Sequence, residues 1–277
     1  MTILYTIIAA LLQGVAEFLP VSGSGHLAAI YELTGAGADV NINMLFIAFL
    51  QLGTLVAIVI TFRRDLQAIV REIAVLLQGG DSAARTAPTP PARIAFLVAA
   101  ATVPMLLAIP LYSAVRTLFV MPAFIGLMVV VTGALLYVTS RYIKKGTKTE
   151  RTFSITDAIV VGLAQLVSLV PGLSRAGATI AVALTRGANR DFAIKFSYLM
   201  SIPAILGAFI ATFVGAVRNN VLFTALPLCL LGFVISAIVG VFAISFLRRM
   251  MTKDRFTLFG YYNVIAGTLI IILSLIF

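Results

Sequence analysis

Six stretches of the sequence are apolar over about 20 residues, the length that a helix needs to cross a bilayer. The composition agrees, because 61% of the 277 residues are hydrophobic and only 11% are charged, whereas a soluble domain carries roughly a quarter charged residues. We therefore expect an all-α integral membrane protein, with residues 1–277 forming a single polytopic membrane domain. The six expected crossings are residues 41–62, 93–113, 118–140, 196–216, 221–247 and 257–276.

Two further apolar segments, residues 2–30 and 155–185, are broken near their middle by Gly, Pro and Ser. Broken backbone at membrane depth is tolerated where it faces protein or a wet cavity. Each segment is therefore expected to form a re-entrant helical hairpin. The shorter stretch 66–78 is expected at the membrane interface, and residues 79–92 as a loop.

Basic residues are concentrated in four of the connections between these segments. Residues 63–93 and 141–151 carry five each, 186–195 carry three and 248–255 carry four, while 114–122 and 218–220 carry one each. Basic loops stay in the cytoplasm, so we expect a plasma-membrane protein with both termini outside. The net charge of +10 is thus explained by topology, and no nucleic-acid partner is expected.

Each half of the chain would contain one hairpin and three crossings, in a first repeat over about 1–140 and a second over about 152–277. An odd number of crossings per half makes the two repeats inverted. The run Gly14 to Glu17 resembles the run Gly162 to Gln165. Inverted repeats with broken helices place their site where the repeats meet, so the two hairpin tips are expected to lie together.

The first tip carries one acid and the only histidine of the chain. Gln13 and Glu17 are four residues apart and share a helix face. Pro20 ends or kinks that helix, and an isolated carboxylate at this depth needs a compensating partner. The turn that follows, Ser22-Gly23-Ser24-Gly25, exposes backbone N–H groups and two hydroxyls before His26 opens the next helix.

The second tip reads Pro171-Gly172-Leu173-Ser174-Arg175-Ala176-Gly177-Ala178-Thr179. Its Pro-Gly turn leads into a helix whose first turn holds Ser174 and Arg175. Free N–H groups at a helix start, together with a guanidinium, favour an anion. Thr179 shares the face of Arg175.

Structural roles are open for each of these residues. Glu17 and Arg175 could form an ion pair that joins the repeats, and His26 could be a structural histidine. Gln13 could be a supporting hydrogen-bond partner. The hydroxyls could cap or pack helices, namely those of Ser22, Ser24, Ser174 and Thr179. Taken together, a carboxylate, an imidazole, an arginine and N–H groups suit phosphoryl chemistry.

At these residues the chain resembles the undecaprenyl-diphosphate phosphatase family, also called the bacitracin-resistance family. The family's first motif is a Glu or Gln, three residues, Glu, then Phe-Leu-Pro-Val-Ser-Ser-Thr-Gly-His, and it matches Gln13 to His26. Its second, Pro-Gly-x-Ser-Arg-Ser-Gly-x-Thr, matches Pro171 to Thr179. The stretch Phe196 to Ala204 is also similar to the family.

The resemblance implies hydrolysis of a polyprenyl diphosphate to the monophosphate and inorganic phosphate, which recycles the lipid carrier of cell-wall glycans. It also implies a site that opens to the outer face and a divalent cation, Mg²⁺ or Ca²⁺. By this resemblance Glu17 and Gln13 hold the metal or a catalytic water, Arg175 clamps the diphosphate, and His26 is the nucleophile or general acid/base. Phosphate binding is expected from Gly25, Gly172, Ser174, Gly177 and Thr179.

Two positions depart from the family pattern, because Gly23 replaces the middle Ser of the first motif and Ala176 replaces the Ser after the motif arginine. If a hydroxyl at position 23 were the nucleophile, His26, Ser22, Ser24 or an activated water would have to replace it; we favour His26, with water second. The alternative function is a transporter or flippase for a prenyl phosphate, which would bind the same headgroup without cleaving it. A channel is disfavoured because the two turns form no continuous polar path. The sequence leaves the oligomeric state open, and a homodimer is one candidate.

Overall fold

The computed structural model describes residues 2–34, 40–78, 88–142, 146–219, 222–252 and 255–276, and within these ranges every regular element is a helix. Six helical stretches are long and apolar enough to cross a membrane, which confirms the predicted all-α fold with six crossings. They are Ile42–Thr61, Pro90–Leu111, Pro122–Tyr142, Arg190–Arg218, Ala225–Met251 and Phe256–Ile276.

The first of the two broken segments forms α1 (Ile3–Ala16) and α2 (Gly23–Thr34), and the second forms α8 (Ile155–Val167) and α9 (Arg175–Thr185). Each of these four helices is shorter than a crossing, and the two helices of each pair are joined by a turn at the predicted Gly, Pro and Ser residues. The position of the breaks is confirmed; the re-entrant path through a bilayer stays a prediction.

The crossings are α3 (Val40–Thr61), α7 (Pro122–Tyr142), α10 (Arg190–Arg218), α11 (Leu222–Thr252), α12 (Phe256–Ile276) and a composite of α5 (Pro90–Thr102), the 3₁₀ segment η2 (Val103–Leu107) and α6 (Ala108–Leu118). A continuous helix was expected at 93–113. Pro104 lies inside η2, and because proline cannot donate a backbone hydrogen bond it favours this local tightening.

The stretch expected at the interface is part of α4 (Arg63–Leu77), which buries none of its residues completely. Leu66 and Ile69 pack against the core, whereas Val70 and Leu77 are exposed. This amphipathic surface suits an interfacial helix. Most of the loop predicted at 79–92 falls outside the described residues.

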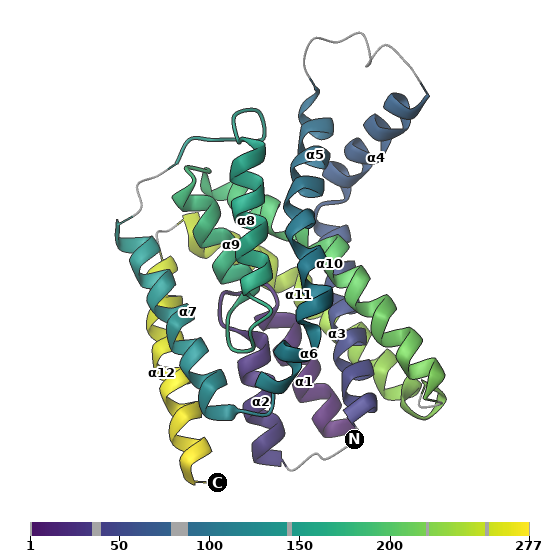
Figure 1. Ribbon diagram of the computed structural model, residues 1–277, viewed down its shortest axis with the longest axis vertical. Coiled ribbons are helices and arrows are strands. Elements are labelled where there is room, and N and C mark those ends of the chain that lie inside the picture. Colours follow the sequence, from purple (N-terminus) through teal and green to yellow (C-terminus); the bar gives the residue numbers. More distant parts are fainter. Residues whose placement is uncertain are drawn as a thin grey trace.

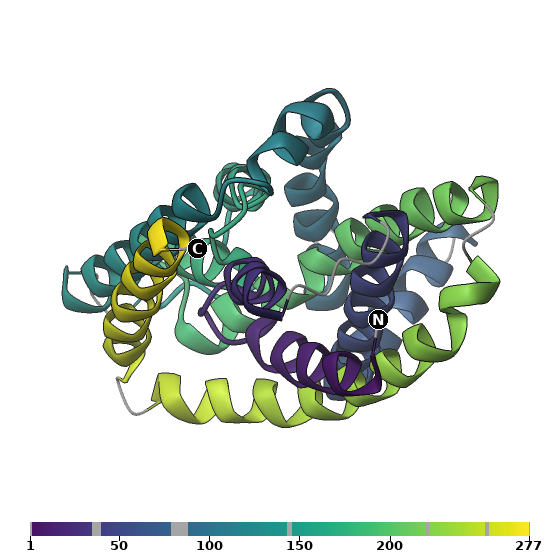
Figure 2. The ribbon, with the colours of Figure 1, turned by 90° about the horizontal axis from the view of Figure 1, so that it is seen from below.

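Helices α7 and α12 lie side by side along their length (Figure 1). Glycines bring the two backbones together at two levels: a Cβ on Gly267 would lie 2.5 Å from the carbonyl oxygen of Gly126, and a Cβ on Gly133 would lie 2.7 Å from that of Gly260. Figure 2 shows this pair on one side of the molecule, α3 and α10 on the other, and the α1–α2 hairpin between them.

Helix α1 begins and α12 ends at the same end of the molecule (Figures 1 and 2). The four basic connections are linked to one another by short contacts. Arg93 donates to the carbonyls of Glu150 and Phe153, Lys148 pairs with the backbone of the α9–α10 turn, and Arg190 donates to the carbonyl of Met251. All four therefore share one end, as the predicted cytoplasmic location requires.

The two hairpins make matched local contacts. Ser22 Oγ accepts from the backbone N–H of Gly25 before α2, and Ser174 Oγ accepts from Gly177 before α9. In the first helix of each hairpin a glycine sits against a crossing of the other half, Gly14 against α11 and Gly162 against α5. The inverted repeats, with boundaries near 1–140 and 152–277, stay a prediction.

Candidate active site

The last turn of α1 presents the carboxylate of the first motif. Glu17 directly follows α1, and Gln13 Nε2, one turn earlier, donates to Glu17 Oε2 at 2.6 Å. Gln13 is buried, and the Glu17 side chain is only 12% exposed. The predicted shared face is thus present, and the amide of Gln13 fixes one carboxylate oxygen.

The second motif opens α9 with a sharp turn. Gly172 has φ +95°, a left-handed conformation that favours glycine. Ser174 caps α9, and Arg175 is its first residue. Thr179 Oγ1 donates to the carbonyl of Arg175 at 2.8 Å and shares a 2.6 Å hydrogen bond with Ser197 Oγ. The hydroxyl of Thr179 therefore holds the start of α9 rather than pointing away from protein.

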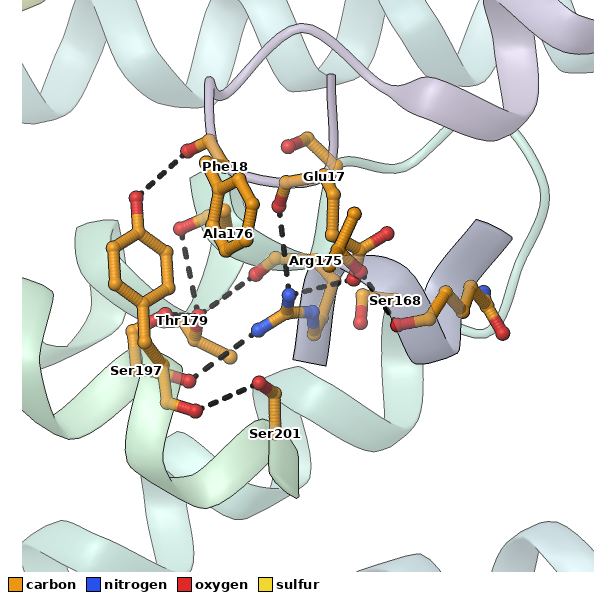
Figure 3. A network of polar contacts seen from close by, with 12 residues as sticks. Glu17, Phe18, Ser168, Arg175, Ala176, Thr179, Ser197 and Ser201 are labelled. Carbon is orange, nitrogen blue, oxygen red and sulfur yellow. Dashed lines mark hydrogen bonds and ion pairs between the residues drawn. The ribbon is translucent and has the colours of Figure 1, made fainter. Parts of the chain in front are cut away.

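The two turns meet, as predicted from the repeats. Arg175 Nη2 lies 2.7 Å from Glu17 Oε1 (Figure 3). The backbone N–H of Gly172 donates to Ser24 Oγ at 3.1 Å. Arg175 Nη1 also donates to the carbonyl of Ser197 on α10. The guanidinium and the carboxylate thus compensate each other's charge in a largely buried place, which is the ion pair considered from sequence.

The hydroxyls of the two capping serines are already used by the backbone. Ser22 is 1% exposed and Ser174 is 2% exposed, and each accepts the N–H of the residue three positions later. Ser22 also has φ +61°, an uncommon and costly conformation for a serine. This geometry favours capping for Ser22, and a bridging role between turns for Ser24.

His26 lies in the first turn of α2 and is held from both ring nitrogens. Its Nδ1 is 2.9 Å from the carbonyl oxygen of Ser22, and its Nε2 is 2.7 Å from the hydroxyl of Tyr262 on α12. The two rings are stacked, with centroids 5.6 Å apart and planes within 7°. The His26 ring is thus held by the turn before α2 and by α12, whereas the Glu17 carboxylate is held by α1 and α9.

Several residues outside the two motifs position them. Thr132 on α7 accepts from the N–H of Ser174 at 3.1 Å, and its own proton is shared between the carbonyls of Met128 at 3.1 Å and Gly172 at 3.2 Å. Tyr198 donates to the carbonyl of Phe18, and Asn263 donates to that of Pro20. Ser197 and Tyr198 fall in the third stretch with family resemblance, but Thr132, Tyr262 and Asn263 lie in apolar runs that carried no signal.

The residues present suit a divalent cation only if other ligands come with it. Among the described residues no group of three His, Cys, Asp or Glu side chains could hold a metal. Glu17 and the side-chain oxygen of Gln13 are oxygen donors at the junction, and Mg²⁺ commonly takes one or two carboxylates together with substrate phosphates. The donor set thus fits a cation that is shared with a bound diphosphate.

The chain matches a known protein family over most of its length. A family profile described as bacitracin resistance protein BacA matches residues 6–269. The chain belongs to the BacA family. It is 35% identical to the undecaprenyl-diphosphatase of Carboxydothermus hydrogenoformans over 97% of this chain and 96% of that protein. It is 36% identical to proteins of the same name from Methanobrevibacter smithii, over 98% and 97%, and Rubrobacter xylanophilus, over 99% of each chain.

The BacA match spans both turns, α7, and α12 as far as residue 269. The two departures from the family pattern lie in different surroundings. Ala176 is 1% exposed inside α9. Gly23 opens α2, and a Cβ there would lie 3.2 Å from Gln13 Oε1 and 3.4 Å from Ala16 Cβ. A serine at position 23 would therefore need only a small adjustment and would stand beside Gln13.

Proposed function

We propose that this protein hydrolyses undecaprenyl diphosphate to the monophosphate and inorganic phosphate, and so recycles the lipid carrier of cell-wall glycan synthesis. The observation that carries the proposal is the junction of Glu17 and Arg175 at 2.7 Å, in a chain of the BacA family whose relatives are named undecaprenyl-diphosphatase. The names of those relatives give no support to the transporter or flippase alternative.

Arg175 binds the diphosphate. A guanidinium at the start of a helix offers two parallel donors to phosphate oxygens, next to the positive end of the helix dipole. In the free protein this guanidinium is satisfied by Glu17 and by the carbonyl of Ser197. The arriving headgroup replaces the Glu17 contact, while the Ser197 contact keeps the guanidinium in place.

His26 carries the chemistry in the mechanism that we favour. Nε2 attacks the terminal phosphorus, the bond from that phosphorus to the bridging oxygen breaks, and prenyl monophosphate leaves with the electron pair. Water then takes the phosphoryl group from Nε2 and releases inorganic phosphate. The Nδ1 contact to the Ser22 carbonyl at 2.9 Å stabilises the positive charge that the ring acquires. Direct attack by water is the second choice.

Glu17 and Gln13 are the residues that would hold Mg²⁺ or Ca²⁺ together with the diphosphate. When bound, the cation would neutralise phosphate charge and acidify a coordinated water. The Gln13 donation at 2.6 Å leaves the second Glu17 oxygen with the guanidinium. Displacement of Arg175 from Glu17 by substrate would thus release a carboxylate oxygen for the metal.

The topology proposed for this multi-pass membrane protein puts both termini and the site opening on the outer side. Support comes from the clustering of the basic connections at the end away from the start of α1 and the end of α12. Single cysteines in a Cys229→Ala background test this orientation. A cysteine at position 2 should react with an impermeant maleimide in intact cells, and one at position 151 should react only after lysis; the reverse pattern would refute the topology.

Phosphate release decides between hydrolysis and transport. Detergent-purified protein should release phosphate from undecaprenyl diphosphate, and EDTA should stop the release. His26→Ala should keep lipid binding and lose turnover, whereas Arg175→Ala should lose both. Lipid binding that depends on Arg175, with no phosphate released by the unaltered protein, would support a carrier instead.

A further inference from the structure

Tyr262 lies outside both motifs, yet it is the side chain that meets the reactive side of His26. Its hydroxyl is 2.7 Å from His26 Nε2, and its ring is nearly parallel to the imidazole. The tyrosine is 46% exposed, so neither packing nor burial requires the hydroxyl at this position.

The contacts assign the imidazole hydrogens. The carbonyl of Ser22 can only accept, so His26 Nδ1, 2.9 Å away, must carry the proton. In the neutral ring Nε2 is then the acceptor, and the Tyr262 hydroxyl donates to it. The pair of partners therefore selects one of the two tautomers.

The contacts of the neighbouring residue fix how α12 is rotated about its axis, and so fix the position of Tyr262. The next residue, Asn263, is fully buried and donates from Nδ2 to the carbonyl of Pro20 at 2.7 Å and to that of Phe259 at 2.7 Å. Consecutive residues of α12 thus contact the first turn, Asn263 its backbone and Tyr262 its histidine. Gly260 and Gly267, on the same face of α12 as Asn263, hold the helix against α7.

The geometry points to Tyr262 as a positioning residue of His26: its hydroxyl donates to Nε2 and so supports the Nδ1–H tautomer that the Ser22 carbonyl sets, with Nε2 as the nitrogen that reacts. This inference rests on the proposed function for its catalytic consequence, whereas the tautomer itself does not depend on the reaction.

One histidine in the whole chain makes the tautomer directly measurable. Protein labelled with ¹⁵N-histidine should give one imidazole spin system, and at about pH 9, where an imidazole is ordinarily neutral, the proton should be found on Nδ1. In Tyr262→Phe the Nε2 resonance should move, because its donor is lost while the stacked ring remains. A proton on Nε2 in the unaltered protein, or an Nε2 resonance unmoved by Tyr262→Phe, would overturn the inference.

Turnover provides the second readout. Tyr262→Phe should lower kcat roughly tenfold with KM nearly unchanged, as expected when an orienting partner of a functional histidine is removed. Tyr261→Phe is the matched control, since the ring of Tyr261 contacts that of Tyr137 instead, with centroids 5.8 Å apart and planes tilted by 56°, and it should leave both kcat and the imidazole spectrum unchanged. A Tyr262→Phe enzyme with full kcat would refute the positioning role. If the unaltered protein released no phosphate, the proposed function would fail, and the spectra would still decide the tautomer.

Discussion

Arg175 on α9 and Glu17 at the end of α1 form a 2.7 Å ion pair between residues 158 positions apart, with the two side chains only 16% and 12% exposed. The pair joins the two hairpin turns, and it also contains the charges that phosphoryl chemistry needs. Both interpretations considered from sequence thus apply to the same atoms, and stability and activity must be measured separately to distinguish them.

Removing either partner alone should destabilise the protein. We expect Glu17→Gln and Arg175→Gln each to cost about 1–3 kcal/mol, because a largely buried charge is left uncompensated, and the double variant to cost less than the sum. Thermal unfolding in detergent measures the stabilities. All three variants should release no phosphate; an active double variant would show that the pair is structural only. Asp65→Asn, which breaks the more exposed pair with Lys195, is the control and should cost under about 1 kcal/mol.

Two glycines of the first turn should respond differently to an added side chain. A Cβ on Gly25 would lie 2.5 Å from Val129 Cγ2, whereas one on Gly23 would meet Gln13 Oε1 at 3.2 Å. We expect Gly25→Ala to destabilise by about 1–3 kcal/mol. Gly23→Ser should fold with an unchanged midpoint of unfolding and should retain phosphatase activity. Loss of activity in Gly23→Ser, with the fold intact, would mean that this chain requires the glycine.

The hydroxyl of Thr132 should matter more than its volume. Thr132→Val would leave the N–H of Ser174 and the carbonyl of Gly172 without their α7 partner. Unpaired buried polar groups cost about 1–3 kcal/mol in total, and lower affinity for diphosphate should accompany the loss because the start of α9 loosens. Thr132→Ser keeps the hydroxyl and should behave closer to the unaltered protein; equal effects of the two changes would indicate packing instead.

Asp157 at the start of α8 should make stability depend on acid pH. Burial would raise the pKa of this carboxyl, but hydrogen bonds from Lys148, the Ser154 backbone and Arg186 hold its pKa well below the ordinary value. A group whose pKa is lowered by folding contributes stability above its unfolded pKa, near 4, and loses it as the pH falls further. Asp157→Asn should therefore be less stable by about 1–2 kcal/mol at pH 7, a figure discounted because Lys148 and Arg186 are partly exposed.

Melting temperatures of the unaltered protein and of Asp157→Asn, recorded from pH 7 down to about pH 3, check this dependence. The two curves should draw together as the pH falls below about 4, where the unfolded chain begins to bind a proton at this carboxyl while the folded protein does not. A difference that stays constant over the whole range would mean that the carboxyl contributes through shape and not through charge.

The fold was predictable where hydropathy alone decides it. A run of about 20 apolar residues must be a crossing, and Gly172 or Pro20 must interrupt a helix, so the crossings and the breaks were predicted correctly. The partners of the site were less accessible. Thr132, Tyr262 and Asn263 are single polar residues in apolar helices, and their contacts depend on how α7 and α12 rotate about their axes. The break at Pro104 was missed because an apolar run says nothing about which type of helix it forms.

The glycine contacts between α7 and α12 restrict how a long isoprenoid can reach the junction. Backbone touches backbone at Gly126–Gly267 and again at Gly133–Gly260, two levels separated by seven residues, or about 10 Å of helix. A hydrocarbon chain has no room to slide between two helices in such contact. The tail of a membrane-borne substrate must therefore leave the headgroup through another seam of the helix bundle, and this pair of helices forms a closed wall toward the lipid.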